Sequence, residues 1–154
     1  MKMHLGCDVL KLLEGKTLAT AESLTGGGIG AVLTAVPGAS AVYKGGVISY
    51  TNEIKARVLG VSPDTLEVHG AVSCATAEEM AVGVRALLQS DVAVSVTGLA
   101  GPGGDEYGNP VGTVCIGYSD AWESFAVRLH FEGDREAVRE QTIRAALELI
   151  IDNQ

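Results

Sequence analysis

Ser23 stands immediately before a glycine-rich segment, in the run ESLTGGG that covers residues 22–28. Glycines at the start of a helix let the backbone approach a ligand closely, and the free N–H groups and helix dipole there favour negative charge. A serine hydroxyl beside such amides could attack a carbonyl carbon while the amides stabilise the resulting oxyanion. The same run also fits a helix that Thr25 caps, with glycines that only permit tight packing.

A serine hydroxyl needs a base before it becomes a nucleophile. The three histidines, His4, His69 and His130, fall where surface or structural roles are expected, which disfavours a Ser-His-Asp triad. Lys55 is the stronger candidate for the base. Asn52 is a plausible N-cap, so Lys55 would lie in the first turn of a helix, where the dipole lowers the amine pKa if the site is partly dry. Such a lysine can accept a serine proton; a solvent-facing lysine is the alternative.

Two further segments flank these candidates. Tyr50 ends the strand before Lys55, and it could relay or orient a proton or simply be a strand aromatic. Residues 98–104 (GLAGPGG) begin the longest predicted loop, which continues to Pro110. Long loops in compact domains are often functional, so its amides could bind a ligand, although a flexible surface loop is the alternative. The Cys and His residues lack metal-ligand spacing, so no metal site is predicted.

The hydrophobic pattern predicts the elements that must position these residues. Helices are expected over 3–14, 25–36, 52–60, 62–68, 73–88 and 134–151, and strands over 18–21, 42–50, 91–97, 111–118 and 122–131. The long helix should bury Ala77, Met80, Ala81, Val84, Leu87 and Leu88. β-α-β connections followed by a hairpin indicate an α/β fold, a layered α/β sandwich with a mixed β-sheet covered by helices. Residues 1–154 show no repeat or linker, so one domain is expected.

Composition narrows the function classes. The net charge is −8 and no Lys/Arg cluster occurs, so nucleic acid and anionic membranes are poor candidates as partners. A small phosphorylated ligand can still bind to backbone N–H groups. The three cysteines, Cys7, Cys74 and Cys115, are widely spaced, which favours buried free thiols over disulfides. The N-terminus predicts neither a signal peptide nor a membrane span, so we expect a cytoplasmic protein.

Five ordered motifs resemble the CinA C-terminal family, and together they cover almost the whole chain, from about Leu5 to Leu149. They are residues 20–27 (TAESLTGG), 45–52 (GGVISYTN) with Lys55, 70–73 (GAVS), 96–104 (VTGLAGPGG) and 110–114 (PVGTV). The family includes amidases that hydrolyse the carboxamide of nicotinamide mononucleotide to nicotinic acid mononucleotide and ammonia. The resemblance therefore implies a hydrolase that acts in pyridine nucleotide recycling.

The resemblance also assigns roles to individual residues. It implies that Ser23 is the nucleophile and Lys55 the base, with Tyr50 assisting. A nucleotide pocket would be lined by Thr25, Gly26, Gly27, Thr97, Gly98, Gly101, Gly112 and Thr113. Arg139 or Arg144 could supply a cation for the phosphate, although a surface position fits either residue equally well. The family implies a homo-oligomer, and no cofactor is expected.

The chain departs from the family pattern at two places. Asn109 precedes Pro110 where the family often has a lysine, which weakens the case for a phosphate contact from that side chain. We expect a stand-alone domain without the N-terminal domain of longer CinA proteins, so the pyrophosphatase activity of that domain is not transferred. Two alternatives stay open: a non-catalytic nucleotide-binding domain associated with competence or DNA damage, and a purely structural assembly domain.

Overall fold

A mixed β-sheet forms the centre of the protein in a computed structural model that describes residues 2–154, with side chains from residue 4 onward. Met1, with which the predicted domain begins, lies outside the described residues. The sheet order is β2-β1-β3-β4-β5. The strands are β1 (Leu18–Glu22), β2 (Tyr43–Ile48), β3 (Val92–Gly98), β4 (Thr113–Ser119) and β5 (Ser124–His130). The first three strands are parallel, and β4 and β5 form the predicted antiparallel hairpin.

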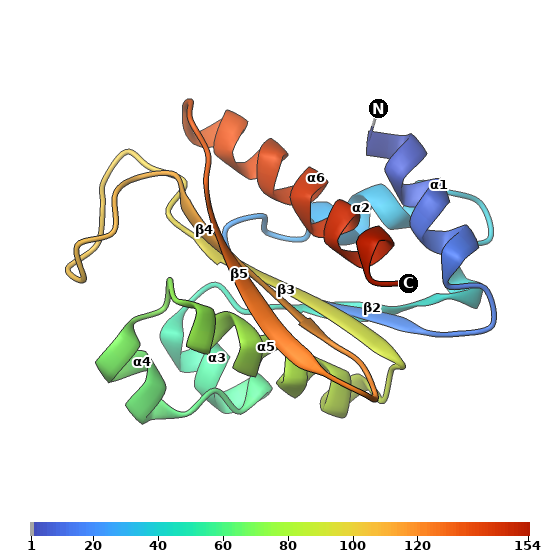
Figure 1. Cartoon of the computed structure of the whole chain (residues 1–154), viewed down its shortest axis with the longest axis horizontal. Helices are drawn as coiled ribbons and strands as arrows, with labels where there is room; N and C mark the ends of the chain where they lie inside the picture. Colours follow the sequence, from blue (N-terminus) through green and yellow to red (C-terminus); the bar gives the residue numbers. More distant parts are fainter. Residues whose placement is uncertain (1) are drawn as a thin grey trace.

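Helices cover both faces of this sheet (Figure 1). One face carries α1 (Lys2–Leu12), α2 (Gly28–Thr34) and α6 (Arg135–Asp152), and the other carries α3 (Asn52–Leu59), α4 (Pro63–His69) and α5 (Cys74–Leu88). A short 3-10 helix, Ala39–Ala41, precedes β2. The layered α/β sandwich with a mixed sheet is therefore confirmed.

The apolar periodicity places one hydrophobic core on each face of the sheet. Leu33 of α2 and Leu147 of α6 pack against the first face, and Met80 and Val84 of α5 pack against the second. Each of these four side chains is fully buried. The prediction for Leu87 was wrong, because the buried stripe continues to Leu88 and leaves Leu87 half exposed at the side of the helix.

Two predicted helix starts need correction. Thr25 does not cap a helix: α2 begins only at Gly28, because Gly27 takes a left-handed conformation with φ of 102° that L side chains rarely adopt. Helix α3 is capped by Thr51, whose hydroxyl accepts the N–H of Ile54, and not by Asn52. Neither shift moves Lys55 out of the first turn of its helix.

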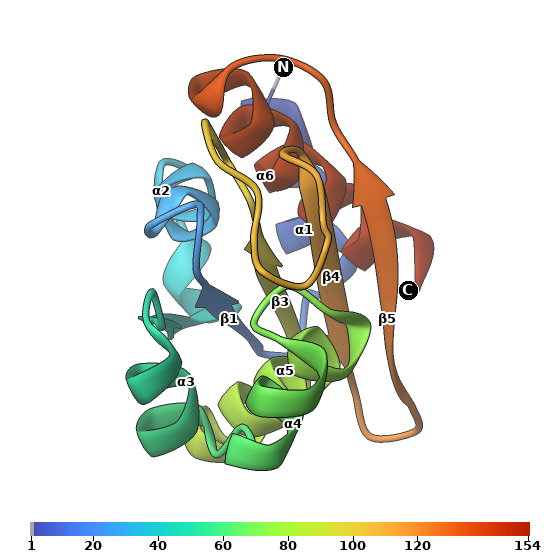
Figure 2. The same ribbon diagram turned by 90° about the vertical axis from the view of Figure 1, so that its left-hand side faces the viewer.

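The parallel strands bring three segments to one edge of the sheet. Glu22 is in register with Ile48 on one side and with Val96 on the other, so the carboxyl ends of β1, β2 and β3 lie together. The segments that follow these strands, 23–27, 49–51 and 99–112, emerge at this edge (Figure 2). Ligands of open α/β sheets bind at such edges. In the described part of the chain, no helix is both long and apolar enough to cross a membrane.

Candidate active site

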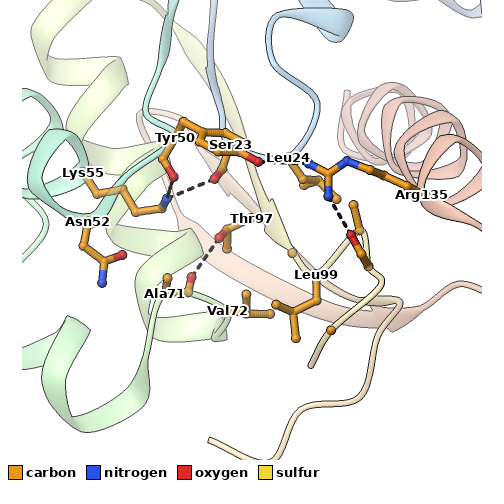
Figure 3. A pocket seen from close by; sticks show the side chains of 14 residues that line it. Ser23, Leu24, Tyr50, Asn52, Lys55, Ala71, Val72, Thr97, Leu99 and Arg135 are labelled. Atoms are coloured by element: carbon orange, nitrogen blue, oxygen red, sulfur yellow. Dashed lines mark hydrogen bonds between the residues drawn. The ribbon is translucent and has the colours of Figure 1, made fainter. Parts of the chain in front are cut away.

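A cavity of about 300 Å³ opens at this edge of the sheet, where Ser23 and Leu24 of the first glycine-rich segment meet residues 98–101 of the second. Ser23 comes from the turn after β1, Lys55 from the first turn of α3 and Arg135 from the first residue of α6 (Figure 3). Residues 98–101 form the wall opposite. Side chains that are far apart in the sequence thus share one pocket.

Ser23 and Lys55 are in direct contact. The Nζ atom of Lys55 donates to the Oγ atom of Ser23 at 3.0 Å (Figure 3). It also donates to the carbonyl oxygens of Ser49 at 2.8 Å and Tyr50 at 3.4 Å. Only 7% of Ser23 and 1% of Lys55 is exposed to solvent. This pair has the geometry of a nucleophile beside its base, within ordinary hydrogen-bond reach.

Burial lowers the pKa of Lys55 from 10.5 to about 8. The hydrogen-bond partners of the amine are a hydroxyl and two carbonyls, so no carboxylate compensates for its positive charge. The predicted direction of the shift is confirmed, with desolvation as its cause. Near neutral pH a useful fraction of this amine is uncharged and able to accept the proton of Ser23.

Glu22 holds the turn that carries Ser23, a role that was not predicted from the sequence. Its carboxylate is 2% exposed and accepts hydrogen bonds from the Thr25 hydroxyl at 2.6 Å and from the N–H groups of Ile29 at 2.9 Å and Gly30 at 3.0 Å. It therefore occupies the N-terminus of α2, where a negative charge is stabilised. The sequence does contain a signal for this role. The first N–H groups of a helix have no acceptor within the helix, and Glu22 stands only seven and eight residues before Ile29 and Gly30.

The segment that follows Ser23 does not open into the cavity. Thr25, Gly26 and Gly27 are absent from its lining in the described structure. The N–H of Gly26 donates to the carbonyl of Ser23, and the N–H of Gly28 donates to that of Thr25. The amides that the sequence offered to a phosphate are thus largely used within the protein.

Arg135 is a second basic residue at the cavity besides Lys55, and sequence reasoning missed it. Its Nη1 donates to the Gly101 carbonyl at 2.7 Å and its Nη2 to the Tyr50 hydroxyl at 3.0 Å. Neither Arg139 nor Arg144 lines the cavity: the first donates to the carbonyls of residues 24 and 25, and the second pairs with a glutamate on the surface of α6. Arg135 directly follows the N-cap Asp134, where the helix dipole disfavours a positive charge. This unfavourable position could have indicated a functional role for the arginine.

Tyr50 lies at the cavity mouth with 58% of its surface exposed. Its hydroxyl accepts the hydrogen bond from Arg135, while its carbonyl faces Lys55. The hydroxyl contacts the guanidinium and not the Ser23–Lys55 pair.

Some of the remaining predicted pocket residues, in and beside the loop between β3 and β4, line the cavity and others do not. Thr97, Gly98 and Gly101 line the cavity, and the Thr97 hydroxyl donates to the Ala71 carbonyl in the adjoining wall. Gly112 and Thr113 lie away from the lining in the described structure. Their N–H groups donate to the carbonyls of residues 99 and 110. They close the base of the loop.

Asn109 anchors this loop. Its side-chain amide donates to the carbonyl of Val72 at 3.2 Å and to Asp105 at 2.8 Å, and its carbonyl accepts from Arg128 at 2.6 Å. Among the described residues, no histidine lines the cavity and no three His, Cys, Asp or Glu side chains gather as metal ligands.

Known proteins share both the sequence and this architecture. The family model described as the CinA C-terminal domain matches residues 5–153. A CinA-like protein of Thermosynechococcus vestitus is 48% identical over 147 residues, which cover 92% of this chain and 35% of that protein. The chain thus spans about a third of the length of the curated relatives it matches.

Two crystal structures agree with the fold over nearly the full chain. The competence damage-inducible protein A from Klebsiella pneumoniae has 39% identity and a TM-score of 0.95, covering 98% of this chain and 95% of that one. A CinA superfamily protein from Escherichia coli has 33% identity and a TM-score of 0.98, covering 100% and 91%. The chain belongs to the CinA C-terminal domain family.

Proposed function

We propose that this protein is an amidohydrolase that converts nicotinamide mononucleotide to nicotinic acid mononucleotide and ammonia through a Ser/Lys mechanism. The observation that carries the proposal is the buried contact of 3.0 Å between the Lys55 amine and the Ser23 hydroxyl. A lysine with a lowered pKa beside a serine is the arrangement that activates a hydroxyl without a histidine. The motifs that resemble the nicotinamide-nucleotide amidases supply the substrate class.

The reaction would begin when uncharged Lys55 takes the proton of Ser23 and the oxygen attacks the carboxamide carbon. The N–H of Leu24 is the proposed donor to the oxyanion, because it follows the nucleophile, lines the cavity and has no acceptor among the described residues. Lys55 then passes the proton to the departing nitrogen, which leaves as ammonia. A water, deprotonated by the same amine, would hydrolyse the ester on Ser23 and release the acid.

The phosphate of the nucleotide is assigned to Arg135. A guanidinium presents five donors in a fixed fork, and two of these positions are held by Gly101 and Tyr50. The remaining donors are the proposed phosphate contacts. Tyr50 would then act by orienting this arginine. An acidic protein with a net charge of −8 would thus bind an anion through one placed cation.

The proposal is tested by incubating the purified protein with nicotinamide mononucleotide and measuring ammonia and the nucleotide product. Nicotinamide riboside, which lacks only the phosphate, is the matched control. We expect turnover of the nucleotide and much slower release of ammonia from the riboside. Binding of the nucleotide without ammonia release would instead support a non-catalytic nucleotide-binding domain, and the absence of both would contradict the proposal.

A further inference from the structure

Two cysteines meet beneath the wall of the cavity, on the face of the sheet that α5 covers. Ala77 of α5 lies directly over Gly117 of β4, since a Cβ atom on that glycine would collide with the Ala77 carbonyl. Cys74 is one helical turn before Ala77, and Cys115 is two residues before Gly117 on the same side of the strand. The packing of α5 on β4 therefore stacks the first turn of the helix over Cys115.

Contacts confirm this juxtaposition. Cys115 packs in one buried cluster with Val72 and Ala77, which stand two residues before and three residues after Cys74. Cys74 lies close enough to Cys115 to contribute to the electrostatic environment of its thiol. Of the three cysteines predicted to be buried, only Cys115 is: Cys74 is exposed and Cys7 is half-buried.

The two thiols differ in their access to solvent. Burial raises the pKa of Cys115 to about 12, with neighbouring Cys74 adding to the shift and Arg128 opposing it. Cys115 thus stays protonated and shielded, whereas Cys74 meets dissolved reagents at the first position of a 15-residue helix. An exposed thiol above a buried one is the arrangement of a reacting and a resolving cysteine.

The pair is joined to the cavity through its neighbours. Val72, which belongs to the same buried cluster as Cys115, lines the cavity, and its carbonyl accepts a hydrogen bond from Asn109. Arg128, which lies opposite Cys115 in the sheet, donates to the same asparagine. A movement at Cys74 and Cys115 would therefore reach the loop that forms one wall of the pocket.

We propose that Cys74 and Cys115 form a reversible intramolecular disulfide when the protein meets a peroxide, and that this bond shifts the Val72–Asn109 wall of the cavity. The Cys74 sulfur would attack the O–O bond of hydrogen peroxide, giving a sulfenic acid and one water. As the Cys115 sulfur attacks the Cys74 sulfur, the proton of the Cys115 thiol passes to the departing hydroxyl group, which leaves as a second water. Two thiols lose two electrons, and one peroxide is reduced to two waters.

The covalent bond would change the local packing because it requires the sulfurs to approach to about 2.05 Å, much closer than two non-bonded sulfur atoms can lie. The first turn of α5 would move toward β4. Only Ser73 separates Val72 from this turn, so the wall would move with it.

The test is a titration of the reduced full-length protein with hydrogen peroxide, followed by intact-mass analysis and peptide mapping. We expect a loss of about 2 Da, a peptide cross-link between Cys74 and Cys115, and full reversal by a dithiol reductant. The Cys7→Ser variant should behave like the wild type. The Cys74→Ser variant should lose no mass, and Cys115→Ala should stop at an added oxygen of about 16 Da on Cys74.

Hydrogen exchange of the backbone amides tests the link to the cavity. Oxidation should change exchange in residues 70–76 and in residues 105–110, and Cys74→Ser should show neither change. Oxygen addition to wild-type Cys74 without the cross-link, or cross-links only between molecules, would overturn the disulfide. A disulfide that leaves exchange in both segments unchanged would overturn the coupling. Neither measurement depends on turnover, so these results are independent of the proposed amidase activity.

Discussion

The two glycine-rich segments of this protein resemble each other in composition and differ in use. In residues 22–28, the carboxylate of Glu22 takes the helix amides, and the turn is closed around its own hydrogen bonds. In residues 98–104, the backbone lines the cavity and offers the Gly101 carbonyl to Arg135. The first segment holds Ser23 in a fixed position, and the second shapes the cavity in front of it. Glycine content alone therefore does not identify an anion site, because a segment can bind an anion only through N–H groups that the protein itself does not already use.

Substitution of Lys55 should have the largest effect, because it removes the base while leaving both glycine-rich segments intact. Lys55→Met is expected to lower kcat/KM by roughly 10³-fold or more. It should also stabilise the fold by about 2 to 3 kcal/mol at pH 7, because a buried amine with a lowered pKa is unfavourable when charged. Urea unfolding of both proteins measures this gain.

The size of that gain depends on pH in a checkable way. The folded protein binds fewer protons than the unfolded chain between pH 8 and 10.5, the folded and ordinary pKa values of Lys55. The penalty is therefore complete below pH 8 and fades as the pH rises toward 10.5. A stabilisation by Lys55→Met that persisted unchanged at pH 10.5 would contradict the assignment.

The closed segment can be broken at Glu22. Glu22→Gln keeps the shape but puts an amide donor against helix N–H groups, which should destabilise the protein by about 2 to 4 kcal/mol. The nucleophile should lose its position, so kcat should fall with little change in KM. Glu53→Gln in the first turn of α3 is the matched control. Its exposed carboxylate pairs with Arg57 at the surface, and water can replace such a bond, so the cost should be below about 1 kcal/mol.

The open segment can be tested at Arg135. Arg135→Met should raise KM for nicotinamide mononucleotide by roughly 10- to 30-fold, because an exposed charge-assisted contact contributes about 1.5 to 2 kcal/mol. The matched control is Arg144→Met, which removes only a surface pair with Glu148. Equal effects of the two substitutions on KM would contradict the assignment of the phosphate to Arg135.

The pH dependence of kcat/KM should follow Lys55 directly. Below its pKa of about 8 the amine is protonated and cannot accept the proton of Ser23. The rate should rise about tenfold per pH unit on the acid side and level off above pH 8. Initial rates between pH 5.5 and 9.5 give the profile, and a rate that declines from pH 6 upward would exclude Lys55 as the base.

The sequence was sufficient to predict which residues lie close together where the order of the strands alone brings them together. Ser23 and Lys55 follow neighbouring parallel strands, so placing them at one edge of the sheet required only the strand assignment. Arg135 lies 85 residues beyond Tyr50, and the direction of its side chain depends on how α6 crosses the sheet. The role of Glu22 was hidden for a related reason. From the sequence, a carboxylate at the end of a strand could equally be a ligand-binding group. Only the structure shows that the N-terminus of the following helix donates its N–H groups to Glu22.

The central claim, that Ser23 is activated by Lys55 to hydrolyse an amide, is tested most directly by ammonia release from nicotinamide mononucleotide in Ser23→Ala and Lys55→Ala beside the wild type. The Ser23–Lys55 contact predicts that release is abolished in both variants while each still binds the nucleotide, since Arg135 and the 98–101 wall are untouched. Full activity in Ser23→Ala would contradict the covalent mechanism.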